Sequence, residues 1–225
     1  MSVSVRAAAC AALVVAAQSA SAVVIDYTDI PQGTDVVNLV LGPTSVTITA
    51  EPDRNFKYKT VNGVTGVGVA GGAVDGEIDN DESIGFAFSE SIYLNTVQIC
   101  FLYTDGNFGD VGDEIAKFIT NIGTWTLTAD TATTGTWTGP AGVVSNVSIA
   151  TEAGGASWII DAPGTGLFGA GVTSVTLISG NPGASGSYAD FSFQNLDFSR
   201  EIPAPGALAC IAAAGALGAT RRRRS

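Results

Sequence analysis

Carboxylates are the side chains most able to do chemistry in this 225-residue chain, because it contains no histidine. The lack of histidine excludes Ser-His-Asp and Cys-His nucleophiles and most zinc sites. Acidic residues gather in two segments, "DGEIDNDE" at 75–82 and "DGNFGDVGDE" at 105–114. Oxygen ligands at alternate positions suit Ca²⁺, the only cofactor that the sequence suggests. The candidate calcium ligands are Asp75, Glu77, Asp79, Asp81, Asp105, Asn107 and Asp110.

Neither acidic segment matches the calcium loop of an EF-hand. That loop needs glycine at its sixth position, where the first segment has Asn80 and the second has Asp110. Two imperfect loops could still share one ion across a fold. The alternative is that both segments are solvated acidic turns.

Two carboxylates facing each other across a cleft could also hydrolyse a glycosidic bond. No other feature of the sequence indicates catalysis, so we expect a protein that is not an enzyme. A secreted carboxylate-dependent polysaccharide hydrolase is the alternative. The repeated "GTWT" at 123–126 and 135–138 predicts a β-hairpin that brings Trp125 and Trp137 together. The two indoles are a candidate glycan platform, and packing within the hairpin or the core is the other interpretation.

The elements that must position these residues are strands. Runs such as "SVTITA" at 45–50 and "YADFSFQNLDF" at 188–198 alternate apolar and polar residues, which is typical of strands with one buried face. Further apolar runs at 84–88 and 92–103 predict two more strands, and Gly- and Pro-rich turns separate the runs. We therefore expect residues 23–200 to form an all-β domain, a single antiparallel β-sandwich of jelly-roll-like type.

The charge of this central domain excludes one class of partner. Residues 23–201, which are the domain and the Glu201 that follows it, hold five basic and 21 acidic residues, a net charge of −16. A surface this acidic repels the phosphate backbone of nucleic acids. We expect no nucleic-acid partner.

The N-terminal segment, residues 1–22, is typical of a secretory signal peptide. Arg6 is followed by an apolar run at 7–17 and then by small residues. This order of a charged, an apolar and a small-residue region predicts export, with cleavage set by Ala20 and Ala22.

The C-terminal segment, residues 201–225, combines a structure breaker, an apolar run and a basic cluster. Pro203 and Pro205 precede the apolar residues 207–219, which are few for a membrane span. Arginines stay on the cytoplasmic side of a membrane. We therefore expect a short transmembrane helix that leaves the central domain outside. The alternatives are an ordinary anchor with a basic flank and a cleavable sorting tail that belongs to no named system. The cluster consists of Arg221, Arg222, Arg223 and Arg224.

This three-part ending resembles the PEP-CTERM sorting signal, which bacteria with an outer membrane pair with the protease exosortase. Pro203-Ala204-Pro205 stands where the signal has Pro-Glu-Pro, and "IPAPGALA" resembles a variant of it. The resemblance implies processing near these residues by an exosortase-type protease and a transient intermediate in the inner membrane. It also implies a final location at the cell surface or in the extracellular matrix, often within polysaccharide.

The resemblance implies nothing about the activity of residues 23–200. Together with the strand pattern, it leads us to expect a surface-sorted protein that is structural, adhesive or glycan-binding. Extracellular polysaccharide is the partner that this location would offer.

Overall fold

The chain is built from strands wherever its structure, a computed structural model, describes it. The described residues are 22–52, 54–72, 74–79, 81–106, 112–139, 142–148, 156–162, 166–180 and 190–200. The elements are, in order, β1 (Val23–Asp26), the 3₁₀ turn η1 (Tyr27–Asp29), β2 (Val36–Leu41), β3 (Thr44–Glu51), β4 (Phe56–Val61), β5 (Val64–Val69), β6 (Ser83–Cys100), β7 (Ile115–Thr120), β8 (Gly123–Ala129), β9 (Gly135–Thr138), β10 (Val143–Asn146), β11 (Trp158–Asp161), β12 (Val172–Ser179) and β13 (Ser192–Arg200). The prediction of an all-β, antiparallel fold is confirmed.

The two ends of the chain lie outside the described residues. Residues 1–21 of the predicted signal peptide, with Ala20, fall there, whereas Ala22 is the first described residue; the predicted C-terminal helix, Pro203, Ala204, Pro205 and the four arginines also fall there. Across the described ranges, no helix is both long and apolar enough to cross a membrane.

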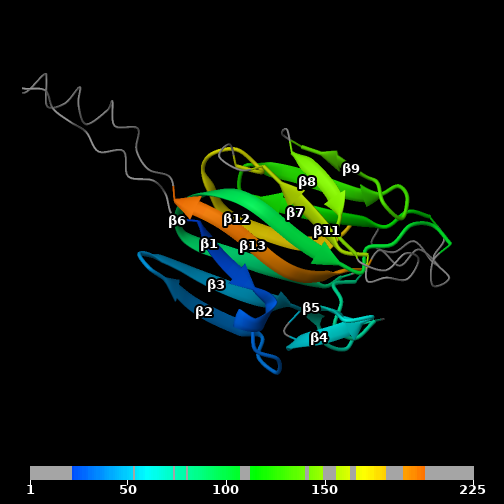
Figure 1. The fold of residues 1–225 in the computed structure, drawn as a ribbon. Helices are drawn as coiled ribbons and strands as arrows, with labels where there is room; N and C mark the ends of the chain where they lie inside the picture. Colours follow the sequence, from blue (N-terminus) through cyan, green and yellow to red (C-terminus); the bar gives the residue numbers. More distant parts are fainter. Residues whose placement is uncertain are drawn as a thin grey trace, which may run out of the picture. The chain divides into compact units, whose positions relative to one another are not determined.

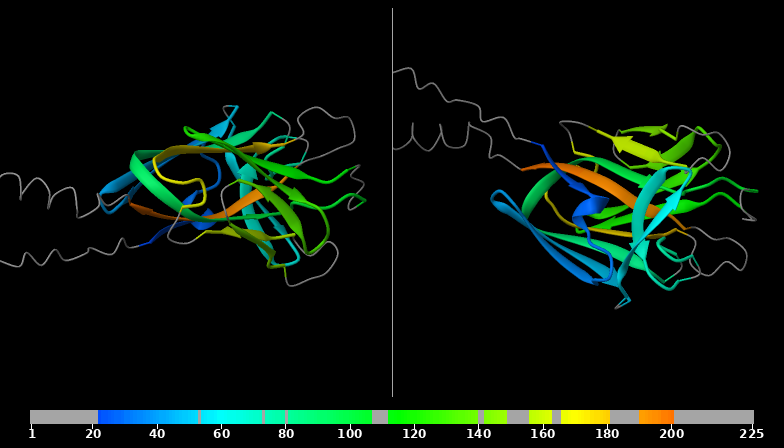
Figure 2. Two further views of the ribbon diagram at one scale, coloured as in Figure 1. Left: turned by 90° about the horizontal axis from the view of Figure 1, so that it is seen from above. Right: turned by 60° about the horizontal axis from the view of Figure 1, so that its bottom comes forward.

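One long strand, β6, organises the sheet. Its first half pairs with β3 and β12, and its second half pairs with β13 and β11. The first branch runs β2-β3-β6-β12-β7-β8-β9, and the second runs β10-β11-β6-β13 with β1 and β5-β4 on the far side of β13. Figure 1 shows β13, in orange, among these strands, and Figure 2 shows them curving around a common interior.

The two branches share one hydrophobic core. Phe86 and Phe88, in the first half of β6, contact Phe193 and Phe198 of β13 with ring centroids 5.0 and 5.3 Å apart. All four rings are buried, and burying a side chain of this size stabilises a fold by about 1.5–3 kcal/mol. The inner faces of the branches therefore hold each other in place.

The prediction of two separate strands at 84–88 and 92–103 is wrong. Residues 83–100 form a single strand, and Phe101 ends it with a positive φ of 66°. The polar residues between the two apolar runs continue the strand, because both halves find partners on each side.

Two β-bulges interrupt the pairing of β6 with β13. The register skips Asn95 between the pairs Asp197↔Thr96 and Phe198↔Leu94, and it skips Gln194 between Phe193↔Ile99 and Asn195↔Gln98. A bulge inserts one extra residue and redirects the side chains beside it. The bulge at Gln194 matters for the site described next.

Candidate functional site

The bulge in β13 brings three amide side chains together on the outer face of the second branch. Leu196 and Phe198 point into the core from β13, whereas Gln194 and Asn195 are both only partly buried. Without the extra residue, consecutive side chains would point to opposite faces of the strand. With it, both amides stand beside Gln98 of β6, the residue paired with Asn195.

These amides form a hydrogen-bonded network across the strands. The Nε2 of Gln98 donates to Oγ of Ser157 (3.0 Å) and to Oε1 of Gln194 (2.9 Å), and its Oε1 accepts from Nδ2 of Asn195 (2.7 Å). The Oγ of Ser157 also donates to Oε1 of Gln194. The Nε2 of Gln194 donates to the Thr65 carbonyl at 3.1 Å.

Each glutamine keeps part of its hydrogen-bonding capacity. A side-chain amide can make four hydrogen bonds, and within the described part of the chain Gln98 and Gln194 each make three. Gln98 keeps one acceptor position and Gln194 keeps one donor. The two therefore offer an acceptor and a donor side by side to a third molecule.

A groove of about 270 Å³ lies over this amide pair. Its described lining is uncharged and combines the polar groups with small apolar walls. The lining residues are Tyr27, Gly63, Val64, Thr65, Gln98, Val147, Ser157 and Gln194. The volume is near the lower end for small-molecule sites, which begin at about 300 Å³, so the groove suits a group of the size of one sugar unit.

Local structure fixes the walls of the groove. Tyr27 belongs to the 3₁₀ turn η1, which Asp26 and Asp29 cap at its N-terminus through a capping box, and its ring lies edge-on to Tyr58 with centroids 5.4 Å apart. Asn62 and Gly63 have positive φ angles of 51° and 83°. Two such residues in a two-residue turn favour a tight hairpin, which carries Val64 and Thr65 into the lining.

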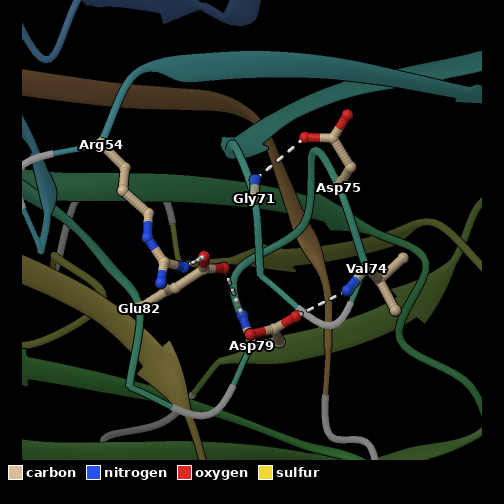
Figure 3. A network of polar contacts seen from close by, with 6 residues as sticks. All are labelled: Arg54, Gly71, Val74, Asp75, Asp79 and Glu82. Carbon is tan, nitrogen blue, oxygen red and sulfur yellow. Dashed lines mark hydrogen bonds and ion pairs between the residues drawn. The ribbon is translucent and has the colours of Figure 1, made fainter.

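The first acidic segment is tied together by its own backbone and by Arg54 (Figure 3). Asp75 accepts a hydrogen bond from the Gly71 amide at 3.0 Å, and Asp79 accepts one from the Val74 amide at 2.8 Å. Glu82 accepts from the Asp79 amide at 3.3 Å and pairs with Nη1 of Arg54 at 2.6 Å. Burial raises the pKa of Glu82 to about 7, against the opposing effect of Arg54. These carboxylates stabilise the turn in which they lie.

Glu77, in the same segment, belongs to a second polar cluster with Lys59 and Asp190. Its Oε1 lies 2.8 Å from Nζ of Lys59. Burial, and then the neighbouring charge of Asp190, raise the pKa of Glu77 to about 8. Burial, and then the nearby charge of Glu77, raise the pKa of both Cys100 and Tyr103. A buried, protonated thiol is a poor nucleophile, so this cluster has no reactive cysteine.

The candidate calcium ligands do not converge where the structure describes them. Asp75, Asp79 and Glu77 are bound as above, Asp81 is exposed, and Asp105 accepts from the Gly112 amide at 2.9 Å. No three carboxylate or thiol side chains of the described ranges meet as ligands. The remaining two candidates, Asn107 and Asp110, lie outside those ranges. A calcium site shared by both loops stays a prediction.

The two tryptophans pack against the hydrophobic core. Strands β8 and β9 pair as predicted, but Trp137 lies opposite Leu127. Both indoles contact Phe168, which is 4% exposed, with ring centroids 4.7 Å away for Trp125 and 5.9 Å away for Trp137. This arrangement corresponds to the packing interpretation, and a role of the indoles in glycan binding stays untested.

The groove itself was missed by the sequence analysis, which found no reason to single out Gln98, Ser157 or Gln194. One signal was present. The expected alternation of apolar and polar residues is wrong beyond Phe193: in "FSFQNLDF", 191–198, the polar residues Gln194 and Asn195 stand together, and the next buried residue is Leu196. Such a break indicates a bulge, and bulges often redirect side chains at functional sites.

Comparisons with protein-family models, with curated proteins and with solved structures find no match for this chain. The function must therefore be inferred from the sequence and from the geometry of the groove.

Proposed function

We propose that the protein is an exported, surface-sorted, non-enzymatic β-sandwich protein of jelly-roll-like type that binds neutral glycans. The observation that carries this proposal is the amide pair Gln98–Gln194, with one acceptor and one donor left over, in a groove that the aromatic residue Tyr27 also lines. An aromatic ring flanked by polar side chains is what we would require of a glycan site in a protein of this kind.

The chemistry of the groove selects for hydroxyl groups. A sugar hydroxyl both donates and accepts, so it can donate to Oε1 of Gln98 while it accepts from Nε2 of Gln194. The apolar face of the sugar ring can lie on Tyr27 or on the Val64 side chain. The described lining has no charged side chain, and the chain has a net charge of −11. An anionic polysaccharide is therefore disfavoured relative to a neutral one.

The two ends of the sequence support the location. A signal peptide would export the chain, and an exosortase-type protease would process the C-terminal segment after its transient insertion in the inner membrane. The protein would then reside at the cell surface or in the extracellular matrix. A glycan-binding groove suits that location, because polysaccharide is abundant there.

Titration with neutral and anionic polysaccharides tests the binding proposal. We expect dextran, galactan or mannan oligosaccharides to bind in isothermal calorimetry, and alginate oligosaccharides to bind more weakly. Gln98→Ala should weaken the binding by about tenfold, since it removes charge-neutral hydrogen bonds worth about 1 kcal/mol each. Gln32→Ala is the matched control, because its side-chain oxygen also accepts a hydrogen bond, from the Tyr58 amide, but Gln32 is not among the lining residues of the groove.

Three results of this titration would count against the proposal. The absence of binding to every neutral oligosaccharide contradicts it, and so does equal weakening by Gln98→Ala and Gln32→Ala. The release of shortened oligosaccharides would instead support the polysaccharide hydrolase.

Mass spectrometry of the C-terminal peptide from native cells tests the sorting proposal separately. A mature chain that ends between Pro203 and Gly206, without the arginines, is expected. An intact C-terminus at Ser225 in the membrane fraction would make the segment an ordinary anchor, and exosortase would not be a partner.

A further inference from the structure

The strands at the edges of the sheet differ in how they are protected against pairing with other chains. An exposed edge strand presents unpaired backbone groups, and proteins usually protect it with lysines, prolines or short length. Strand β4 carries Lys57 and Lys59, and the terminal strands β9 and β10 have four residues each. Strand β2 has six residues, "VVNLVL", with no charge and no proline.

Strand β2 also exposes apolar side chains. Its residues Val37, Leu39 and Leu41 pack against the core, whereas Val36 and Val40 on the other face are 46% and 80% exposed. Among the described strands only β3 pairs with it, and Figure 1 shows β2 at the rim of the sheet. Within the described part of the chain, β2 therefore has one edge without a partner strand and one face with exposed apolar side chains.

We propose that β2 pairs with β2 of a second copy of this chain, antiparallel and centred on Asn38, so that the two sheets join edge to edge. Residues opposite each other in an antiparallel pair point to the same face. A register centred on Asn38 places Val36 of each copy opposite Val40 of the other. The exposed side chains of both copies then lie on the same face of the joined sheet. The strand is thus complementary to itself.

The position of the charges fits a second copy. The charge nearest to β2 in sequence is Asp35, directly before the strand. In this register it stands opposite Leu41 of the other copy, and the two Asp35 side chains lie at opposite ends of the pair. The strands avoid the like charges that destabilise cross-strand pairs. The net charge of −11 on each whole chain still opposes association, and salt screens that repulsion.

One six-residue pair is a small interface, so the association should be weak in solution. Stable complexes bury about 1,200–2,000 Å², more than two strand edges supply. Many copies displayed on one surface would gain from multivalency. The pairing would then join molecules within a matrix.

Sedimentation velocity of the full chain over a range of concentrations tests the proposal. We expect a monomer–dimer equilibrium in which the dimer becomes more stable as NaCl rises from about 20 to 300 mM. The reason is that the Debye length falls to about 10 Å at 0.1 M, so that salt weakens the repulsion between the two acidic chains. Val40→Lys should weaken the dimer by about tenfold, since two apolar cross-strand pairs are lost. Val143→Lys is the matched control, because Val143 is 71% exposed on the edge strand β10.

Equal dimerisation of the two lysine variants and the wild type would overturn the proposal, as would a chain that is monomeric at every concentration and salt. A dimer that weakens with salt would also overturn it, because charge attraction would then hold the copies together.

A disulfide tests the register. In a chain that carries Cys10→Ser and Cys210→Ser, the substitution Asn38→Cys should yield a covalent dimer under mild oxidation, while Val143→Cys should not. If the thiol introduced at position 38 is instead protected from alkylation in the monomer, a segment of the same chain covers the edge, and the proposal fails.

Discussion

Polar side chains fill two regions of this molecule, the groove over Gln98 and Gln194 and the turn of the first acidic segment, and they are used differently. In the turn, each bonded carboxylate satisfies a neighbouring backbone amide or Arg54. In the groove, side-chain amides of β6 and β13 bond one another and the Thr65 carbonyl of β5, and one donor and one acceptor are left over. The acidic turn is more conspicuous in the sequence, but the groove is better suited to a ligand.

The difference shows that a dense cluster of charge is weak evidence for a site. Carboxylates close together in sequence are costly to ionise together unless something nearby binds them. In this turn the chain itself supplies the binding groups, so the acidic residues build local structure. If this distinction is correct, changes in the turn should alter stability, and changes in the groove should alter binding.

The largest effect is expected from Arg54→Ala. Glu82 is fully buried, and removing its cationic partner should lower the free energy of unfolding by about 2–4 kcal/mol at pH 8. At pH 5 the loss should be smaller, because Glu82, with a pKa of about 7, is then protonated. Urea denaturation measures both values. Arg200→Ala removes a more exposed ion pair, 2.8 Å from Glu90, and it should lower the free energy of unfolding much less. Equal losses in the two variants would contradict the structural role of the turn.

The pH dependence of stability should come next in size. Glu77 has a pKa of about 8 in the folded state and an ordinary, lower pKa when unfolded. Between pH 5 and 8 the unfolded chain therefore binds fewer protons, and the free energy of unfolding must fall as the pH rises.

Glu77→Gln should remove much of this fall, on the order of 2 kcal/mol, because the amide cannot ionise. Thermal or urea unfolding at four or five pH values measures the slope. The exposed Glu51 supplies the control, Glu51→Gln, which should leave the slope unchanged. A stability that rises between pH 5 and 8 would show that Glu77 is ionised in the folded protein.

A smaller change of stability is expected in the groove. Gln194→Ala should cost about 1 kcal/mol of folding free energy, because hydrogen bonds at a partly exposed site contribute little net stability. It should nevertheless weaken the binding of neutral oligosaccharides by about tenfold. Calorimetry and urea denaturation of the same variant separate the two effects. A variant that loses stability but keeps its affinity would reverse the comparison of the two regions.

The smallest effect is expected from calcium. Except for the exposed Asp81, the carboxylates of the first acidic segment already have partners, so 5 mM CaCl₂ should shift the melting temperature by less than about 1 °C relative to EGTA. A rise of several degrees, abolished by Asp105→Ala, would show that the two acidic loops do share an ion.

Much of the strand pattern was predictable from sequence. The alternation in "SVTITA" correctly predicted a strand with Val46 and Ile48 buried, because a period of two is a local property. The continuity of β6 was not predictable. Its polar middle stays in the strand because β6 pairs with β3 and β12 before it and with β13 and β11 after it. The groove was not predictable either. It depends on where the bulge at Gln194 falls relative to Gln98, which is 96 residues away in sequence and adjacent only after folding.

The place of Gln194 on β13 has a mechanical consequence. The chain runs from Gln194 along β13 to Arg200, where it leaves the sheet. If the protein is held by its C-terminus and its groove is held by a ligand, tension runs lengthwise along β13. The hydrogen bonds of an antiparallel ladder lie perpendicular to the strand, so the bonds to β6 and β1 would share the load in shear. Under flow, many hydrogen bonds of the ladder would then have to break at the same time, whereas in unzipping they would break one after another.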